Sequence, residues 1–289
     1  MKRILLLLLA LLPALFARAQ RHHEVGVMAG VSAYYGDLQH EYIPNTKLMK
    51  PSAGIIYKYF FNPHLGIRAA ASYINLSAAD SLSPNRADQL RNLDFTNHML
   101  EVQVGLELNI FPIDIEKAKF TPFLFAGIAG TYGNPFTRDI NNEKFHLRNL
   151  STEGQGLPGY PDRKLYSLVN ASFPLGGGFK AYIGKTVLLT AEIGLRYAAT
   201  DYLDDVSRSY VNLDTLRAYK GDKAVELSYR GNEVHDWDGN YPNHKFQRGD
   251  FKKNDWYWTA GVSATVYFDA FGNAKTWLQT KCPRIFGRR

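Results

Sequence analysis

The sequence has one cysteine, few long apolar runs and no large excess of basic or acidic residues. Its single cysteine, Cys282, excludes an intrachain disulfide and argues against a cysteine-ligated metal cluster. After residue 19 no apolar run approaches the length of about 20 residues that a transmembrane helix needs. The formal charge of +7 is not gathered into a basic patch with interleaved aromatic residues, so no nucleic-acid partner is expected.

The N-terminus has the composition of an export signal. Lys2 and Arg3 precede an apolar run over residues 4–16, and a small-x-small site, Ala17-Arg18-Ala19, follows it. This order is typical of a secretory signal peptide, which we place at residues 1–19. The apolar run is too short to span a bilayer as an anchor. The mature chain is therefore expected beyond the inner membrane.

What the chain has in abundance is strict alternation of apolar and polar residues. In residues 99–110, Leu100, Val102, Val104, Leu106, Leu108 and Ile110 share one face of a strand, while Glu101, Gln103, Gly105, Glu107 and Asn109 share the other. Ordinary strands run about five or six residues. A dozen alternating residues is the length that crosses a bilayer at a tilt.

The same pattern recurs at eight places, residues 24–35, 52–61, 66–76, 99–110, 120–131, 173–183, 186–197 and 256–268. The connections alternate between short and long, and the long ones cover 36–51, 77–95, 132–165 and 198–255. Outer-membrane barrels have short periplasmic turns and long external loops. The sequence therefore predicts an all-β fold, an eight-stranded antiparallel transmembrane β-barrel over residues 20–268 of a cell outer membrane protein.

The polar faces of these strands would turn into the barrel. They carry four acids and four bases, namely Glu24, Lys58, Arg68, Glu101, Glu107, Lys180, Glu192 and Arg196. An eight-stranded barrel has room only for side chains, so we expect a lumen plugged by charge pairs. A soluble barrel or β-sandwich would bury these charges and expose the apolar rows to water, which disfavours both. The equal count also argues against an ion-selective pore.

Motifs that carry chemistry are scarce. No histidine sits beside a nucleophile in a recognisable motif, so we predict no catalytic residue and no enzyme. The acidic run 201–205 lacks the ligand spacing of a calcium loop and fits a hydrogen-bonded turn better. The glycines at 176–178 have no following Lys-Ser/Thr, and we expect them to relieve crowding or bend a strand. No metal site and no cofactor are predicted.

The C-terminal tail, residues 269–289, extends beyond the last predicted strand. It mixes basic and apolar residues, and we predict partner binding by Lys275, Trp277, Leu278, Lys281, Arg284, Ile285 and Phe286. Arginine and aromatic anchors are enriched at interface hot spots. The alternative is a solvated terminus without a partner.

Several segments resemble one family. They are His23-Glu-Val-Gly-Val with Tyr35-Gly-Asp37, Gly54-Ile-Ile-Tyr-Lys58, Lys119-Phe-Thr-Pro122 and Asp201-Tyr-Leu-Asp-Asp-Val206. They are similar to the PorG family, outer-membrane barrels of Bacteroidota that belong to the type IX secretion machinery. The resemblance implies a non-enzymatic component that sits in outer-membrane lipid and docks a periplasmic ring of PorK and PorN type. Two alternatives stay open, a stand-alone barrel for envelope integrity or surface adhesion, and a lipid-modifying barrel enzyme.

Overall fold

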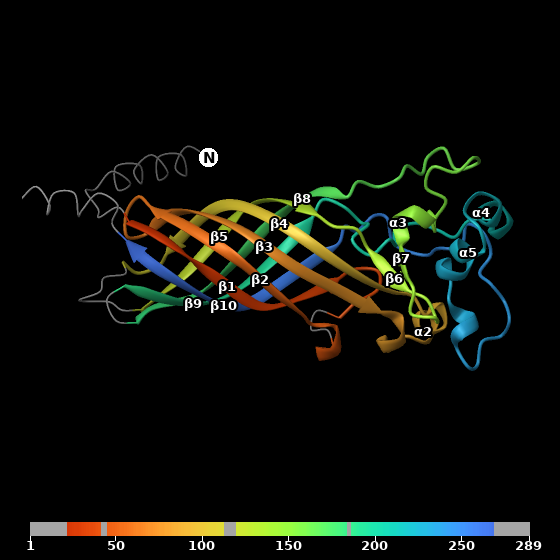
Figure 1. Ribbon diagram of the computed structural model, residues 1–289, viewed down its shortest axis with the longest axis horizontal. Coiled ribbons are helices and arrows are strands. Elements are labelled where there is room, and N and C mark those ends of the chain that lie inside the picture. The colour runs from red at the N-terminus through yellow and green to blue at the C-terminus, as the bar shows by residue number, and fades with distance from the viewer. Residues whose placement is uncertain (1–21, 42–44, 113–119, 184–185, 269–289) are drawn as a thin grey trace, which may run out of the picture.

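The chain folds into a closed antiparallel β-barrel with a folded cap at one end (Figure 1). The computed structural model describes residues 22–41, 45–112, 120–183 and 186–268. Neighbouring strands in the wall follow the order β3-β2-β1-β10-β9-β8-β5-β4, and β3 pairs with β4 to close it. The wall strands are β1 (His22–Tyr35), β2 (Lys50–Phe60), β3 (Leu65–Ala79), β4 (Asp94–Asn109), β5 (Phe120–Tyr132), β8 (Val169–Ile183), β9 (Val187–Ala198) and β10 (Trp256–Phe268).

The predicted fold class is confirmed, since each of the eight alternating segments forms a wall strand of the barrel. Several boundaries differ by up to five residues: β4 begins at Asp94 rather than at Met99, β3 ends at Ala79 rather than at Leu76, and β8 begins at Val169 rather than near Phe173. Pro174 therefore lies inside the strand instead of at its end. The ladder between β5 and β8 has a gap opposite Gly127 and Ile128, and it resumes in the same register. A proline has no N–H to donate, so the strand tolerates it by leaving this part of the ladder open.

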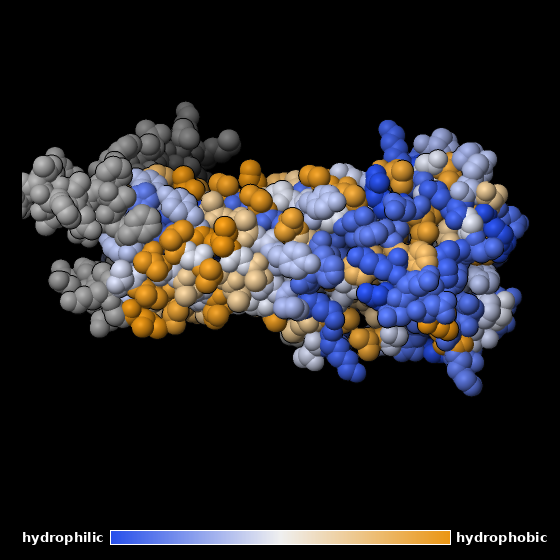
Figure 2. Space-filling model, viewed as in Figure 1, coloured by the Kyte–Doolittle hydropathy of each residue, from blue (hydrophilic) through white to orange (hydrophobic). Residues whose placement is uncertain are grey.

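Alternation along the strands sets an apolar exterior. Val102, Ile128 and Leu175 point outward with 62 %, 64 % and 62 % of their surface exposed. Glu101 and Gln103, the sequence neighbours of Val102, are buried inside. Figure 2 shows the resulting apolar belt on the barrel, next to a hydrophilic cap. An exterior of this kind would be a large exposed apolar patch in water and is suited to lipid. Among the described residues, no helix is both long and apolar enough to cross a membrane.

The connections separate by length between the two ends of the barrel. The long ones, whose described residues are 36–41, 45–49, 80–93, 133–168 and 199–255, gather at the cap end (Figure 1). The short ones join β2 to β3, β4 to β5 and β8 to β9, and the strand ends that they join lie at the other end, with His22 and Phe268. This is the arrangement predicted for external loops and periplasmic turns.

The long connections are structured. They contain the hairpin β6 (Phe136–Arg138) and β7 (Lys144–His146), and the helical segments η2 (Thr46–Leu48), η3 (Asp80–Leu82), α2 (Arg86–Arg91), α3 (Leu147–Leu150), α4 (Leu213–Lys220), α5 (Asp222–Ser228) and η4 (Gly231–Glu233). The hairpin extends the sheet beyond β4, where Phe136 pairs with Thr96. The alternation of the sequence predicts only loops here, and their assembly into a cap depends on contacts between segments far apart in the chain.

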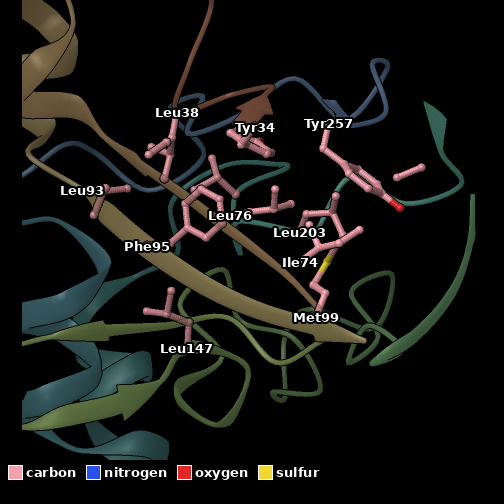
Figure 3. Close-up of a cluster of buried hydrophobic side chains, with 13 residues drawn as sticks. Tyr34, Leu38, Ile74, Leu76, Leu93, Phe95, Met99, Leu147, Leu203 and Tyr257 are labelled. Carbon is pink, nitrogen blue, oxygen red and sulfur yellow. The ribbon is translucent and has the colours of Figure 1, made fainter. Parts of the chain in front are cut away.

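Two apolar clusters stabilise the cap, and one of them joins it to the barrel. The mouth cluster is made of Tyr34, Leu38, Ile74, Leu76, Ala78, Leu93, Phe95, Met99, Leu147, Ala198, Leu203, Val206 and Tyr257. Figure 3 shows its labelled side chains converging from strand ends and cap segments. A second cluster lies within the cap and contains Leu157, Val211, Leu216, Ala224 and Val225. The barrel mouth is therefore closed by a small hydrophobic core of its own.

Candidate functional site: the sealed lumen and its cap

Glu107 is the centre of the deepest charge cluster in the lumen. Lys58 Nζ lies 3.0 Å from Glu107 Oε2, Arg68 Nη1 lies 3.4 Å from the same oxygen, and Lys180 pairs with Glu107 Oε1. Glu24 lies 3.8 Å from Lys58 and 3.9 Å from Lys180. All five side chains are buried. The cations therefore share two carboxylates, which compensates charges that would each be costly alone.

Arg68 links this cluster to a second level of the lumen. Its Nη2 donates to Glu192 at 2.9 Å and 3.2 Å, and its guanidinium lies 3.8 Å from the ring centre of Phe125. A side chain at Gly176 or Gly194 would collide with this ring, since a Cβ would lie 2.6 Å or 2.9 Å from it. The expectation that the glycine run relieves crowding is met at Gly176.

The third level lies under the cap. Arg196 Nη2 lies 3.4 Å from Glu101 Oε1, and Arg196 Nη1 donates to Thr259 at 2.6 Å and to the Gly194 carbonyl at 2.8 Å. Tyr257 donates to Glu101 Oε2 at 2.5 Å. The structure thus places all eight lumen residues of the sequence analysis inside the barrel and brings each into an ion pair.

These side chains occupy three levels of the lumen. A cavity of about 20 Å³ lies beside Glu192 and Arg196, which is room for roughly one water molecule. Acids and bases are matched, so the interior presents no excess of one sign. An interior of this kind stiffens the wall, and it does not resemble the wide polar lumen of a porin.

A further buried charge centre, missed from the sequence, lies in the cap. Glu153 is fully buried and accepts from Arg248 Nη1 at 3.1 Å and from the backbone N–H of Ser207 at 3.0 Å. Arg248 also donates to the Asp205 carbonyl at 2.7 Å. This ion pair ties the connection 133–168 to two distant parts of 199–255. No local sequence signal marks it, because its partners are far apart along the chain.

The acidic run 201–205 is buried against this centre. Asp205 accepts from Tyr166 at 2.7 Å and from Thr152, and burial raises the pKa of Asp205 to about 6 although Arg248 opposes the shift. Burial, with Asp37 and Asp204 nearby, raises the pKa of Asp201 to about 9. These carboxyls hold protons at pH values where exposed ones have lost them.

Tyr34 joins two acids at the barrel mouth. Its hydroxyl lies 2.7 Å from Asp204 and 2.6 Å from Asp255. A hydroxyl donates one proton, so the second carboxyl must itself be protonated to complete the bridge. Burial and the neighbouring acids raise the pKa of both Asp204 and Asp255 well above the usual range, which agrees with this requirement.

The predicted turn at 201–205 is present in part, because the Val206 N–H donates to Asp204 at 2.9 Å. Within the described ranges, no group of three His, Cys, Asp or Glu side chains could hold a metal ion. The predicted partner-binding residues of the tail, Lys275 to Phe286, and the signal peptide at 1–19 lie outside the described residues.

The closed wall, apolar belt and filled lumen define an eight-stranded outer-membrane β-barrel. Within that class, the chain belongs to the family described as a domain of unknown function, DUF6089, whose family model matches residues 2–153. No curated protein matches the sequence.

Several solved structures are similar to this chain. OprG from Pseudomonas aeruginosa shares 10% identity with a TM-score of 0.44, over 87% of this chain and 97% of that one. Ail of Yersinia pestis shares 9% identity with a TM-score of 0.38, over 86% and 99%. Outer membrane protein W of E. coli shares 15% identity with a TM-score of 0.38, over 86% and 98%.

Proposed function

We propose that this protein is a non-enzymatic outer-membrane component of a type IX protein secretion machinery, which docks a periplasmic ring to the membrane. The observation that carries the proposal is the solid barrel. Its lumen is filled by paired charges around Glu107, Arg68 and Arg196, and its mouth is closed by the apolar cluster of the cap. A rigid, closed body in the membrane suits an anchor better than a conduit.

The resemblance to the PorG family supports the choice of machinery. One of the resembling segments, 201–206, supplies the buried acids that fasten the cap to the barrel mouth. The resemblance therefore includes residues that hold the cap in place, in addition to the strand alternation that any outer-membrane barrel shares.

The proposed docking surface is the periplasmic end, namely the short connections together with the tail 269–289. Deleting residues 270–289 should leave a folded barrel in the outer membrane and weaken its co-purification with PorK- and PorN-type ring proteins. Reversing charge at Lys275, Lys281 and Arg284 should act in the same direction. Lys144→Glu/Lys164→Glu/Lys245→Glu, which alters exposed lysines of the cap, is the matched control.

Heat-modifiable electrophoretic mobility reports whether each variant still forms a barrel. Unchanged co-purification and unchanged secretion after the tail deletion would move the docking surface to the short connections. No co-purification of ring proteins with the unaltered protein would refute the proposed function.

A second candidate is a surface-binding barrel, and the cap favours it. The cap has its own apolar cluster and buried ion pair, and it exposes Tyr219, Phe246 and Phe251 with 57 %, 64 % and 60 % of their surface free. Aromatic residues on a rigid external surface suit recognition of another molecule. Alanine at these positions should abolish surface binding and leave secretion intact if this candidate holds, and the reverse pattern favours the secretion role.

A further inference from the structure

A groove of about 1010 Å³ lies on the outside of the barrel, where the cap overhangs the wall. Its floor comes from the outward faces of β9 and β10, and its roof from segments next to Asp37 and Asp250. Neither the lumen network nor the proposed docking surface uses it.

The floor is continuous with the apolar belt. Ile193 and Leu195 are 56 % and 49 % exposed, and strand register places Leu195 beside Trp258. Trp256 is 41 % exposed and packs edge-on against Tyr197 with 5.0 Å between ring centres. Aromatic residues of this kind mark the level at which lipid headgroups meet the acyl chains. The floor is therefore at the level of the bilayer surface, where a lipid can reach it.

The roof is polar and is held in place. The Asp250 N–H donates to Asp37 Oδ2 at 2.9 Å, and Arg91 Nη2 donates to the Asp37 carbonyl at 3.0 Å. Lys253 pairs with Asp250 at 3.0 Å, whereas Lys252 is exposed and has no ion-pair partner among the described residues. His40 also lines the groove and is exposed. The groove thus has an apolar floor and a polar roof, in which two lysines lie beside the acids Asp37 and Asp250 and Lys252 is outside any ion pair of the described residues.

We propose that this groove binds a phosphate-bearing anionic lipid of the outer leaflet. An acyl chain lies along Ile193, Leu195 and Trp258, and the phosphate is held by Lys252 with Lys253 beside it. The volume of the groove is large enough for part of a lipid molecule. Each lysine placed at the membrane surface raises the affinity for anionic headgroups about fivefold. The apolar floor selects a lipid over free phosphate.

Tryptophan quenching tests the proposal, because Trp256 and Trp258 line the groove. The other two tryptophans, Trp237 and Trp277, are replaced by Phe in the full chain. This protein is reconstituted in phosphatidylcholine vesicles containing chain-brominated phosphatidylglycerol or chain-brominated phosphatidylcholine. The anionic lipid should quench at about fivefold lower mole fraction than the zwitterionic one.

Lys252→Glu/Lys253→Glu should reduce this preference to one or below, since two acids repel the anionic headgroup where two lysines attracted it. Lys164→Glu/Lys245→Glu makes the same change of charge elsewhere on the cap and should keep the preference. Equal quenching by both lipids, or equal loss in both double variants, overturns the proposal. Loss of the preference with millimolar inorganic phosphate, but not with chloride at equal ionic strength, assigns the cation site to free phosphate and also overturns it.

Discussion

At the scale of single residues, the direction of each side chain decides its environment. Val104 faces outward and Gln103 inward, although they are neighbours in the sequence, with 51 % and 2 % of their surfaces exposed. A charge placed on the outward face meets lipid, and one placed on the inward face meets the network of ion pairs. Both situations give testable consequences.

Arginine at Val104 should destabilise the barrel by about 2–4 kcal/mol, because this position lies midway along the apolar belt. Val169→Arg is the matched control, since Val169 also faces outward but lies at the cap end of β8. It should cost about 0–1 kcal/mol. Urea unfolding of the protein in lipid vesicles measures both, and equal costs would contradict the assigned depth of the belt.

Removing one partner of the Arg68–Glu192 pair should destabilise the barrel more than removing both. Arg68→Met leaves Glu192 without its cation and takes one of three cations from Glu107, at an expected cost of about 3–5 kcal/mol. Arg68→Met/Glu192→Met leaves Glu107 with Lys58 and Lys180 and should cost less. A double variant less stable than the single one in the same unfolding assay would argue against pairing as the source of stability.

At the scale of elements, the four long connections act as one folded unit. Buried carboxyls at 201–205 tie it together, and the raised pKa of Asp201 and of Asp205 makes its stability depend on pH. Their unfolded pKa is about 4. Protonation of these carboxyls therefore stabilises the folded cap, and this contribution is complete below about pH 4. It is lost as the pH rises through about 6 for Asp205 and through about 9 for Asp201.

The cap should accordingly resist urea better at pH 5 than at pH 8, as measured by the near-ultraviolet circular dichroism of its packed aromatic residues. Asp201→Asn should shrink the difference, because a neutral side chain does not titrate. Exposed acids such as Asp236 and Asp238 have lowered pKa values and titrate below this window. A urea midpoint that rises between pH 5 and pH 8 would contradict the assignment.

At the scale of the whole molecule, the barrel is sealed at several heights. Ion pairs fill the lumen, the bridge from Tyr34 to Asp204 and Asp255 crosses the mouth, and the apolar cluster covers it (Figure 3). The purified protein should therefore show no large, stable single-channel conductance in a planar bilayer. Stepwise openings that depend on protein insertion would show that the plug does not hold in a membrane.

The sequence by itself determined the strands, their facing and the content of the lumen. Alternation with a period of two is a local property, so residues 99–110 predicted both the row of lipid-facing residues and the inward direction of Glu101 and Glu107. The pairing partners could not be predicted. Which cation meets Glu107 depends on the stagger between strands, and closure of β3 on β4 fixes that stagger only in three dimensions.

Only the tertiary structure decided the cap and the groove. The acids of 201–205 looked like a polar turn, because their burial depends on Tyr34, Tyr166 and Arg248 from distant parts of the chain. The groove likewise needs an overhang of 36–40 and 250–254 above outward residues of β9 and β10. A local pattern predicts which face of a strand is turned toward lipid. The burial of polar residues in the cap depends on contacts between segments far apart in the sequence.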